Sequence, residues 1–164
     1  MAITPPLVGD PTLRERIMRV IKRRFEVQQA GVSSAILTWD VVTRLPLTKD
    51  QQLEGYAIGI YDTSEKVRPD IGRDERFLNV AMEFHIKLAE DDDPETYLNG
   101  VLGEVQRVAQ LDLQNKEEDG YALSINMQEK GSELDISGTD SRNVAGLVVF
   151  EVHYRTKANN PFRR

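Results

Sequence analysis

The sequence predicts an α+β fold: a mostly antiparallel sheet of about five strands with two long helices packed on one face. Three observations support this prediction. Residues 78–88 alternate between apolar and other side chains, two amphipathic stretches each follow an Asp-Pro pair, and runs rich in β-branched residues flank these stretches. The elements follow the order helix, three strands, helix, two strands.

The segment Phe77–Leu88 is predicted to be the central strand. Alternate side chains of a strand point to opposite faces of its sheet, so one face of this strand is apolar and needs a cover. The helix pair can supply that cover. The apolar face consists of Leu78, Val80, Met82, Phe84, Ile86 and Leu88.

The totals favour one soluble domain over residues 1–164. No run of about 18 apolar residues indicates a membrane span, and the N-terminus lacks the basic and apolar regions of a signal peptide. The absence of cysteine excludes disulfides and thiolate metal sites and fits an intracellular product. The net charge of −6 argues against a protein coated in nucleic acid.

Residues 1–9 are predicted to be an extended arm, followed by a helix over Pro11–Ala30 with Asp10 as its cap and Gly31 after its end. Strands are predicted at Ser34–Leu45 and Gly55–Asp62, separated by a polar break at 50–54. Gly59 inside the second strand indicates a bulge or a close backbone approach.

The charged segment Thr63–Arg76 is predicted to be a long, exposed hairpin loop that either docks a partner or is simply mobile. A second helix is predicted from Pro94 to about Asn115, and Gly100 and Gly103 suggest that it crosses the first helix there.

Strands are predicted at Gly120–Gln128 and Leu147–Lys157, before an irregular tail at 158–164. The first of these has Tyr121, Leu123, Ile125 and Met127 pointing inward. Between the two strands we expect a turn at 129–133, a short extension of the ladder at Leu134 and Ile136, and a loop at 137–143.

The charge is unevenly spread. Residues 14–24 contain six basic side chains and one acid, and residues 90–119 contain ten acids and two bases. These runs are either solvated helix faces or the two sides of a head-to-tail contact between copies. The basic helix lacks interleaved aromatic residues and a helix-turn-helix partner, which argues against specific DNA binding.

Two carboxylate–imidazole pairs are the best candidates for chemistry: Glu83 with His85, and Glu151 with His153. If their strands were neighbours in register, four metal ligands would converge; otherwise they are polar residues on the wetter sheet face. Asp91, Asp92 and Asp93 are better explained as a helix cap than as a cation site. No nucleophile elbow or phosphate-binding loop is present, so we predict no catalytic residue, metal site or cofactor.

The chain resembles the bacteriophage tail terminators of the lambda type and related tail-completion neck proteins. The likeness lies in the order of elements and in the ending Leu147–Phe162, a strand ending Tyr-Arg-Thr followed by a polar turn and Pro-Phe. It implies a structural virion protein, made in the host cytoplasm, that caps the head-proximal end of the tail tube as a homohexameric ring. Its implied partners are the tail tube protein and the head–tail connector or neck proteins; DNA passes the lumen without specific binding, and no membrane is involved.

Six copies at −6 each give a ring charge of −36, which lets DNA slide past an acidic wall. Charge and exposure single out two sets of contact residues. Axial contacts with the tube are predicted at Glu65, Lys66, Arg68, Asp70, Arg73 and Asp74; subunit contacts are predicted at Arg19, Arg23, Asp91, Asp92, Pro161 and Phe162. The alternatives are a head–tail adaptor, a tail tube subunit, or a small α+β module that contacts nucleic acid through its basic helix.

Overall fold

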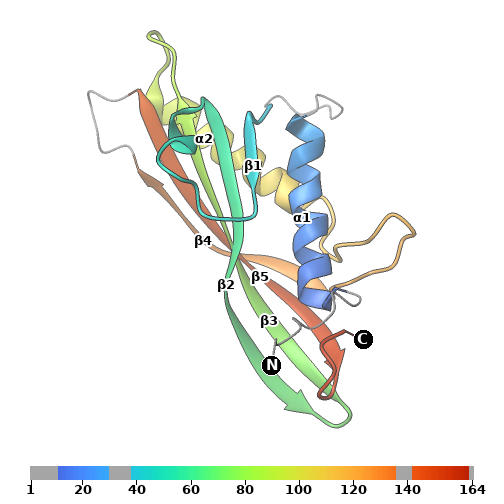
Figure 1. The fold of residues 1–164 in the computed structure, drawn as a ribbon. Coiled ribbons are helices and arrows are strands. Elements are labelled where there is room, and N and C mark those ends of the chain that lie inside the picture. The colour runs from blue at the N-terminus through green and yellow to red at the C-terminus, as the bar shows by residue number, and fades with distance from the viewer. Residues whose placement is uncertain (1–10, 30–37, 136–141, 163–164) are drawn as a thin grey trace, which may run out of the picture.

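The structure, a computed structural model, describes residues 11–29, 38–135 and 142–162. It has one five-stranded sheet in the order β1-β2-β3-β5-β4 and two helices (Figure 1). This confirms the predicted α+β class and the order of its elements. The elements are α1 (Leu13–Gln29), β1 (Val41–Thr43), the 3-10 turn η1 (Gln51–Leu53), β2 (Tyr56–Asp70), β3 (Arg73–Lys87), α2 (Pro94–Ala109), β4 (Asn126–Asp135) and β5 (Asn143–Lys157).

The strand β3 is central, as predicted, with β2 and β5 antiparallel on its two sides. Its even-numbered residues from Leu78 to Ile86 are fully buried and share one apolar core with side chains of both helices. The strict alternation of the sequence therefore marks the face that the helices cover.

Trp39 joins the first helix to the sheet. Its ring meets Phe25 of α1 edge-on at 6.3 Å between centroids and Phe84 of β3 at 6.5 Å. The Phe84 ring covers Gly146 of β5, where a Cβ atom would stand 2.3 Å from the ring atom Cζ. Glycine at 146 therefore makes room for the aromatic cluster.

The first strand differs from its prediction. Only Val41–Thr43 of the expected strand 34–45 is paired, and β1 runs parallel to β2, so the sheet is mixed; residues 34–37 lie outside the described part. The connection to β2 passes over Gly59, where the Leu45 carbonyl oxygen would lie 2.6 Å from a Cβ atom. This confirms the close backbone approach predicted at Gly59.

The prediction of a loop at 63–76 is wrong. β2 and β3 run straight through it and meet in a two-residue turn, Ile71-Gly72, where Gly72 has a φ of +74°. The pairing shifts once, between Asp62 and Ser64. The strands were missed because polar side chains occupy both of their faces here, which removes the apolar alternation that marks a half-buried strand.

α2 begins as predicted, because the Asp93 carboxylate accepts a hydrogen bond from the Thr96 N–H at 3.1 Å. It ends at Ala109 instead of Asn115, since the Asp112 carboxylate accepts the N–H groups of Gln114 and Lys116 and turns the chain. The predicted helix crossing at Gly100 and Gly103 is wrong: Cβ atoms there would have no neighbour within 4 Å.

The last two strands differ from their predictions: residues 120–125 of the strand predicted at 120–128 lie outside β4, and β5 is longer than expected. β4 starts at Asn126 and continues through the expected turn at 129–133, where the pairing with β5 shifts between Glu129 and Gly131. β5 starts at Asn143, four residues early. Tyr121, expected inside, is 44% exposed, whereas Leu123 and Met127 are buried. A bulge therefore absorbs the turn-like residues without ending the strand.

The first helix starts two residues later than predicted, at Leu13, where the Thr12 hydroxyl accepts the Glu15 N–H at 3.2 Å. The tail at 158–162 is irregular, as predicted, apart from a bridge between Lys157 and Asn160. The predicted arm 1–9, the caps Asp10 and Gly31, and residues 136–141 lie outside the described residues. Within the described part, no helix has the length and apolarity needed to span a membrane.

Candidate functional site

The most distinctive feature is a three-stranded arm, which extends beyond both helices at one end of the sheet (Figure 1). We define the arm as residues 64–78 of the β2–β3 hairpin with residues 152–157 of β5, which pairs with β3 along its whole length. All six residues predicted for axial contact lie on the arm. They were expected on a loop but stand on paired strands, so their positions are fixed by the sheet.

The register divides the arm into two faces. The inner face continues the side of the sheet that the helices cover, and the outer face is the opposite side. Of the predicted axial residues, Glu65 and Asp74 stand on the inner face. Lys66, Arg68, Asp70 and Arg73 stand on the outer face.

The outer face is a grid of three rows across three strands. From the core toward the tip, the rows are Lys66, Phe77 and His153; Arg68, Glu75 and Arg155; and Asp70, Arg73 and Lys157. Neighbouring side chains in such a grid are close enough to interact. A shallow hollow on this face is lined by residues of all three rows.

Glu75 is the centre of the outer face. Its carboxylate accepts hydrogen bonds from His153 and Arg155, and the His153 ring stacks on Phe77 at 4.5 Å between centroids. Burial acts to raise the pKa of Glu75, but the hydrogen bonds from His153 and Arg155 outweigh it and hold this pKa below its ordinary value. Glu75 is therefore an ionised anchor that fixes the row to which Arg68 and Arg155 belong.

The inner face is closed by a polar network around Glu65. Its carboxylate accepts hydrogen bonds from Arg76, at 2.7 Å, and from the Tyr154 hydroxyl. Arg76 also donates to the Thr156 hydroxyl at 2.9 Å and lies 3.5 Å from Asp74. Burial, followed by the bond to Glu65, raises the pKa of Tyr154. The inner face thus satisfies its own polar groups.

The tip of the arm exposes an apolar side chain. Ile71 is 98% exposed, and its N–H donates to the Asp70 carboxylate at 2.8 Å. The carbonyl of Gly72 accepts the Ala158 N–H at 3.2 Å, which holds the turn to the end of β5. The tip is therefore well held although its largest side chain stands in solvent.

The basic row of α1 is neutralised within the chain. Arg14 donates to Asp62 at 2.6 Å, Arg16 donates to Glu117 at 2.8 Å, and Arg24 donates to the carbonyls of Ala109 and Asp112 and to the Asn115 side chain. The remaining ion pairs of this row are Arg19 with Glu15, Lys22 with Glu26, and Arg23 with Glu118. The basic run and part of the acidic run thus meet inside one subunit.

The six residues predicted for subunit contact do not form one surface. Arg19 and Arg23 lie on α1 and line a groove of about 960 Å³ together with Phe162, which is 48% exposed. The Pro161 carbonyl accepts the Leu13 N–H and ties the tail to the start of α1. Asp91 and Asp92 follow β3 in the chain and lie at the end of the sheet opposite the arm.

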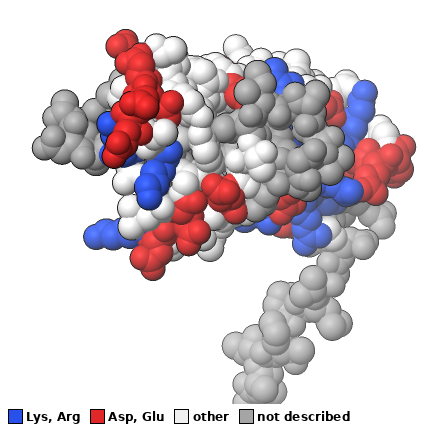
Figure 2. Space-filling model, turned by 90° about the horizontal axis from the view of Figure 1, so that it is seen from above, with Lys and Arg blue, Asp and Glu red and all other residues white. Residues whose placement is uncertain are grey.

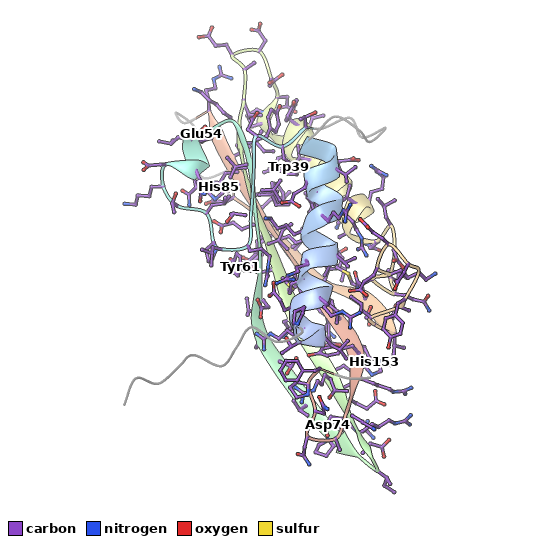
Figure 3. The ribbon with its side chains drawn as sticks, turned by 45° about the vertical axis from the view of Figure 1, so that its right-hand side comes forward. Trp39, Glu54, Tyr61, Asp74, His85 and His153 are labelled. Atoms are coloured by element: carbon purple, nitrogen blue, oxygen red, sulfur yellow. The ribbon has the colours of Figure 1, made fainter. Side chains whose placement is uncertain are left out.

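The two carboxylate–imidazole pairs do not converge. Glu83 contacts His85 at 2.9 Å, but Glu151 and His153 stand opposite Asn79 and Phe77, several residues along β3 (Figure 3). The register therefore decides the alternative that the sequence left open: the strands are neighbours, but the two pairs lie at different heights along them. Across the described residues, no three His, Asp or Glu side chains are grouped to hold a metal ion.

The sequence matches no protein-family model and no curated protein. The resemblance to tail terminators rests on the order of the elements and on residues 147–162.

Sequence reasoning singled out four residues of the outer face, Lys66, Arg68, Asp70 and Arg73, but placed them on a loop. It missed that paired strands join them to Glu75 and to residues 153–157 of β5 as one surface. One signal could have found it: Pro69-Asp-Ile-Gly72 is a turn sequence placed midway between two stretches of equal length.

Proposed function

We propose that this chain is a structural subunit of a phage tail, a terminator whose copies close as a hexameric ring on the head-proximal end of the tail tube. The observation that carries the proposal is the element order, helix–three strands–helix–two strands, with both helices on one sheet face. This is the architecture that the resemblance implies. The ring ends polymerisation of the tube and forms the joint to the head connector.

The arm supports this role because it offers contacts outside the subunit. It extends beyond the helices and holds paired strands to its tip (Figure 1). A rigid projection loses little conformational freedom when it docks, which favours stable assembly. We propose that the arm contacts neighbouring molecules in the joint, among them the tail tube.

The alternative of a different class, a module that binds nucleic acid through α1, is disfavoured by the ion pairs. Tight binding to nucleic acid requires cations that exchange their counterions for phosphates. Arg14 and Arg16 are each held by a carboxylate from another element, and Arg24 holds backbone carbonyls. A gel-shift titration at physiological salt should show no tight complex.

Negative-stain imaging of the purified protein with and without tail tubes tests the proposal. A terminator gives closed rings, free or at one end of each tube. Open stacks indicate the second candidate within virion proteins, a tube subunit, because a terminator does not extend itself. Solitary particles that leave tube ends bare would rule out the terminator role.

A further inference from the structure

The outer face of the arm carries more positive than negative charge although the chain as a whole is acidic. Its grid holds five cations (Lys66, Arg68, Arg73, Arg155 and Lys157) and two carboxylates, which leaves three net positive charges. Both carboxylates are already engaged, Glu75 by His153 and Arg155, and Asp70 by the turn and Arg73. Lys66, Arg68 and Lys157 are exposed around them.

An acidic surface of equal and opposite net charge lies at the opposite end of β3. We call it the acidic end: Glu90, Asp91, Asp92, Asp93 and Glu95, with Lys87 and Arg142 beside them, for three net negative charges. Asp92 and Asp93 accept backbone N–H groups of Ala89 and Thr96, whereas Glu90, Asp91 and Glu95 are exposed. Figure 2 looks down on this end of the molecule and shows acidic side chains gathered there, with a few basic ones between them.

We propose that the outer face of the arm docks on the acidic end of a second copy of this chain. This inference rests on the proposed ring and assigns the outer face to the neighbouring subunit instead of the tube. Glu75, at the centre of the outer face, and Lys87, beside the acidic end, are 12 residues apart on β3, or about 40 Å, so the two surfaces cannot meet within one copy. Contact between unlike surfaces of identical copies is head-to-tail and can close a ring.

The size of the patch favours a second copy over nucleic acid. The patch is about 14 Å long, because its three rows are two residues apart along each strand, and about 10 Å wide, because it spans three neighbouring strands. A duplex presents a continuous track of phosphates and is bound by an extended basic surface. A compact group of carboxylates on a short loop matches the patch better, and complementary charge also directs the approach of the two copies.

The inference replaces one side of the contact predicted from the sequence and keeps the other. Asp91 remains on the acidic side. Arg19 and Arg23, the predicted basic side, already pair with Glu15 and Glu118 within the chain. On the outer face, by contrast, the cations outnumber the carboxylates near them, so positive charge remains for a partner.

Disulfide trapping between two full-length variants tests the contact, because the chain has no cysteine of its own. I71C places a thiol at the tip of the arm, and A89C places one beside the acidic end; neither removes a charge. Mixed under mild oxidation, I71C and A89C should cross-link about tenfold faster than I71C and Q114C, whose second thiol is on an exposed loop elsewhere. Equal rates would overturn the proposal.

Charge exchange identifies the cause. K66E/R68E in the I71C copy should reduce the rate to that of the control pair, and E90K/D91K in the A89C copy should restore it. The charge-matched variant K49E/K116E in the I71C copy should leave it unchanged. A swapped pair that stays slow, or a K66E/R68E variant that keeps the original cross-linking rate, would refute the contact.

The outcomes also separate this inference from the proposed function. Rings that cap tail tubes without the 71–89 cross-link would refute the contact and leave the terminator role. Efficient cross-linking by a protein that leaves tube ends bare would support the contact and remove the terminator role.

Discussion

The basic row of α1 and the outer face of the arm carry similar numbers of cations but differ in how those charges are used. On α1, Arg16, Arg23 and Arg24 reach the segment after α2, and Arg14 reaches β2. On the arm, five cations surround two carboxylates. The first set holds the subunit together, and the second leaves an excess for a partner. A dense run of charge in the sequence therefore need not become a charged surface.

The largest expected effect is on stability, and it tests whether the basic side chains of α1 hold the subunit together. R24A should lower the free energy of unfolding by about 2–4 kcal/mol, because it leaves a buried Asn115 side chain and two carbonyls without their donor. Urea denaturation measures the change. The matched control is R23A, which removes an exposed ion pair on the same helix and should lower the free energy of unfolding by less than about 1 kcal/mol. Equal costs would contradict the distinction.

The second prediction compares the two faces of the arm. R76A should destabilise the protein by about 1–3 kcal/mol, because Glu65 loses its cationic partner in a site where the Arg76 side chain is 17% exposed. Adding E65Q should recover part of the loss, since the uncompensated charge is removed. R68A on the exposed outer face should change stability by less than about 0.5 kcal/mol. An R68A cost as large as that of R76A would show that both faces are structural.

The third prediction concerns pH. The pKa of Glu75 is lower in the folded state than its ordinary value of 4.5, so the unfolded state binds the proton more tightly. The stabilisation by Glu75 is thus present above about pH 4.5 and is lost as pH falls through the lowered pKa. E75Q should flatten this part of the stability profile, measured by urea denaturation from about pH 6 to pH 3. A profile as steep as that of the unmodified chain would show that other carboxylates cause the loss.

The smallest effect is expected from R19E/R23E. Both side chains are more than half exposed and pair with Glu15 and Glu118. Reversal should cost less than about 1 kcal/mol for each pair and leave the association of copies unchanged by light scattering. Association weakened as much as by K66E/R68E would restore α1 as a subunit contact.

The architecture could be predicted from the sequence because the buried faces of its main elements are marked by unbroken apolar patterns. Leu78 to Ile86 alternate without interruption, and Asp93-Pro94 marks the start of α2. The arm was missed because Lys66, Glu75 and Arg155 are polar on the outer face while Glu65 and Arg76 are polar on the inner face, so no period survives.

The candidate surface was only half predictable. Local charge in the sequence identified the acidic end, since Glu90 to Asp93 are consecutive. The basic surface is assembled from three strands, and Arg155 lies 80 residues from its partner Glu75. A grid of this kind depends on strand register, which composition and spacing do not specify. The same dependence explains why the sequence could not decide whether the two histidines meet, and the register keeps them apart.

The unbroken course of β3 has a mechanical consequence. Its middle is buried in the core and hydrogen-bonded on both sides, so the strand cannot shorten, hinge or slide without unfolding the subunit. The strand therefore fixes the distance between the two ends of the molecule. If copies join through those ends, the diameter of the closed assembly is set by the length of one strand and does not adjust to what it caps.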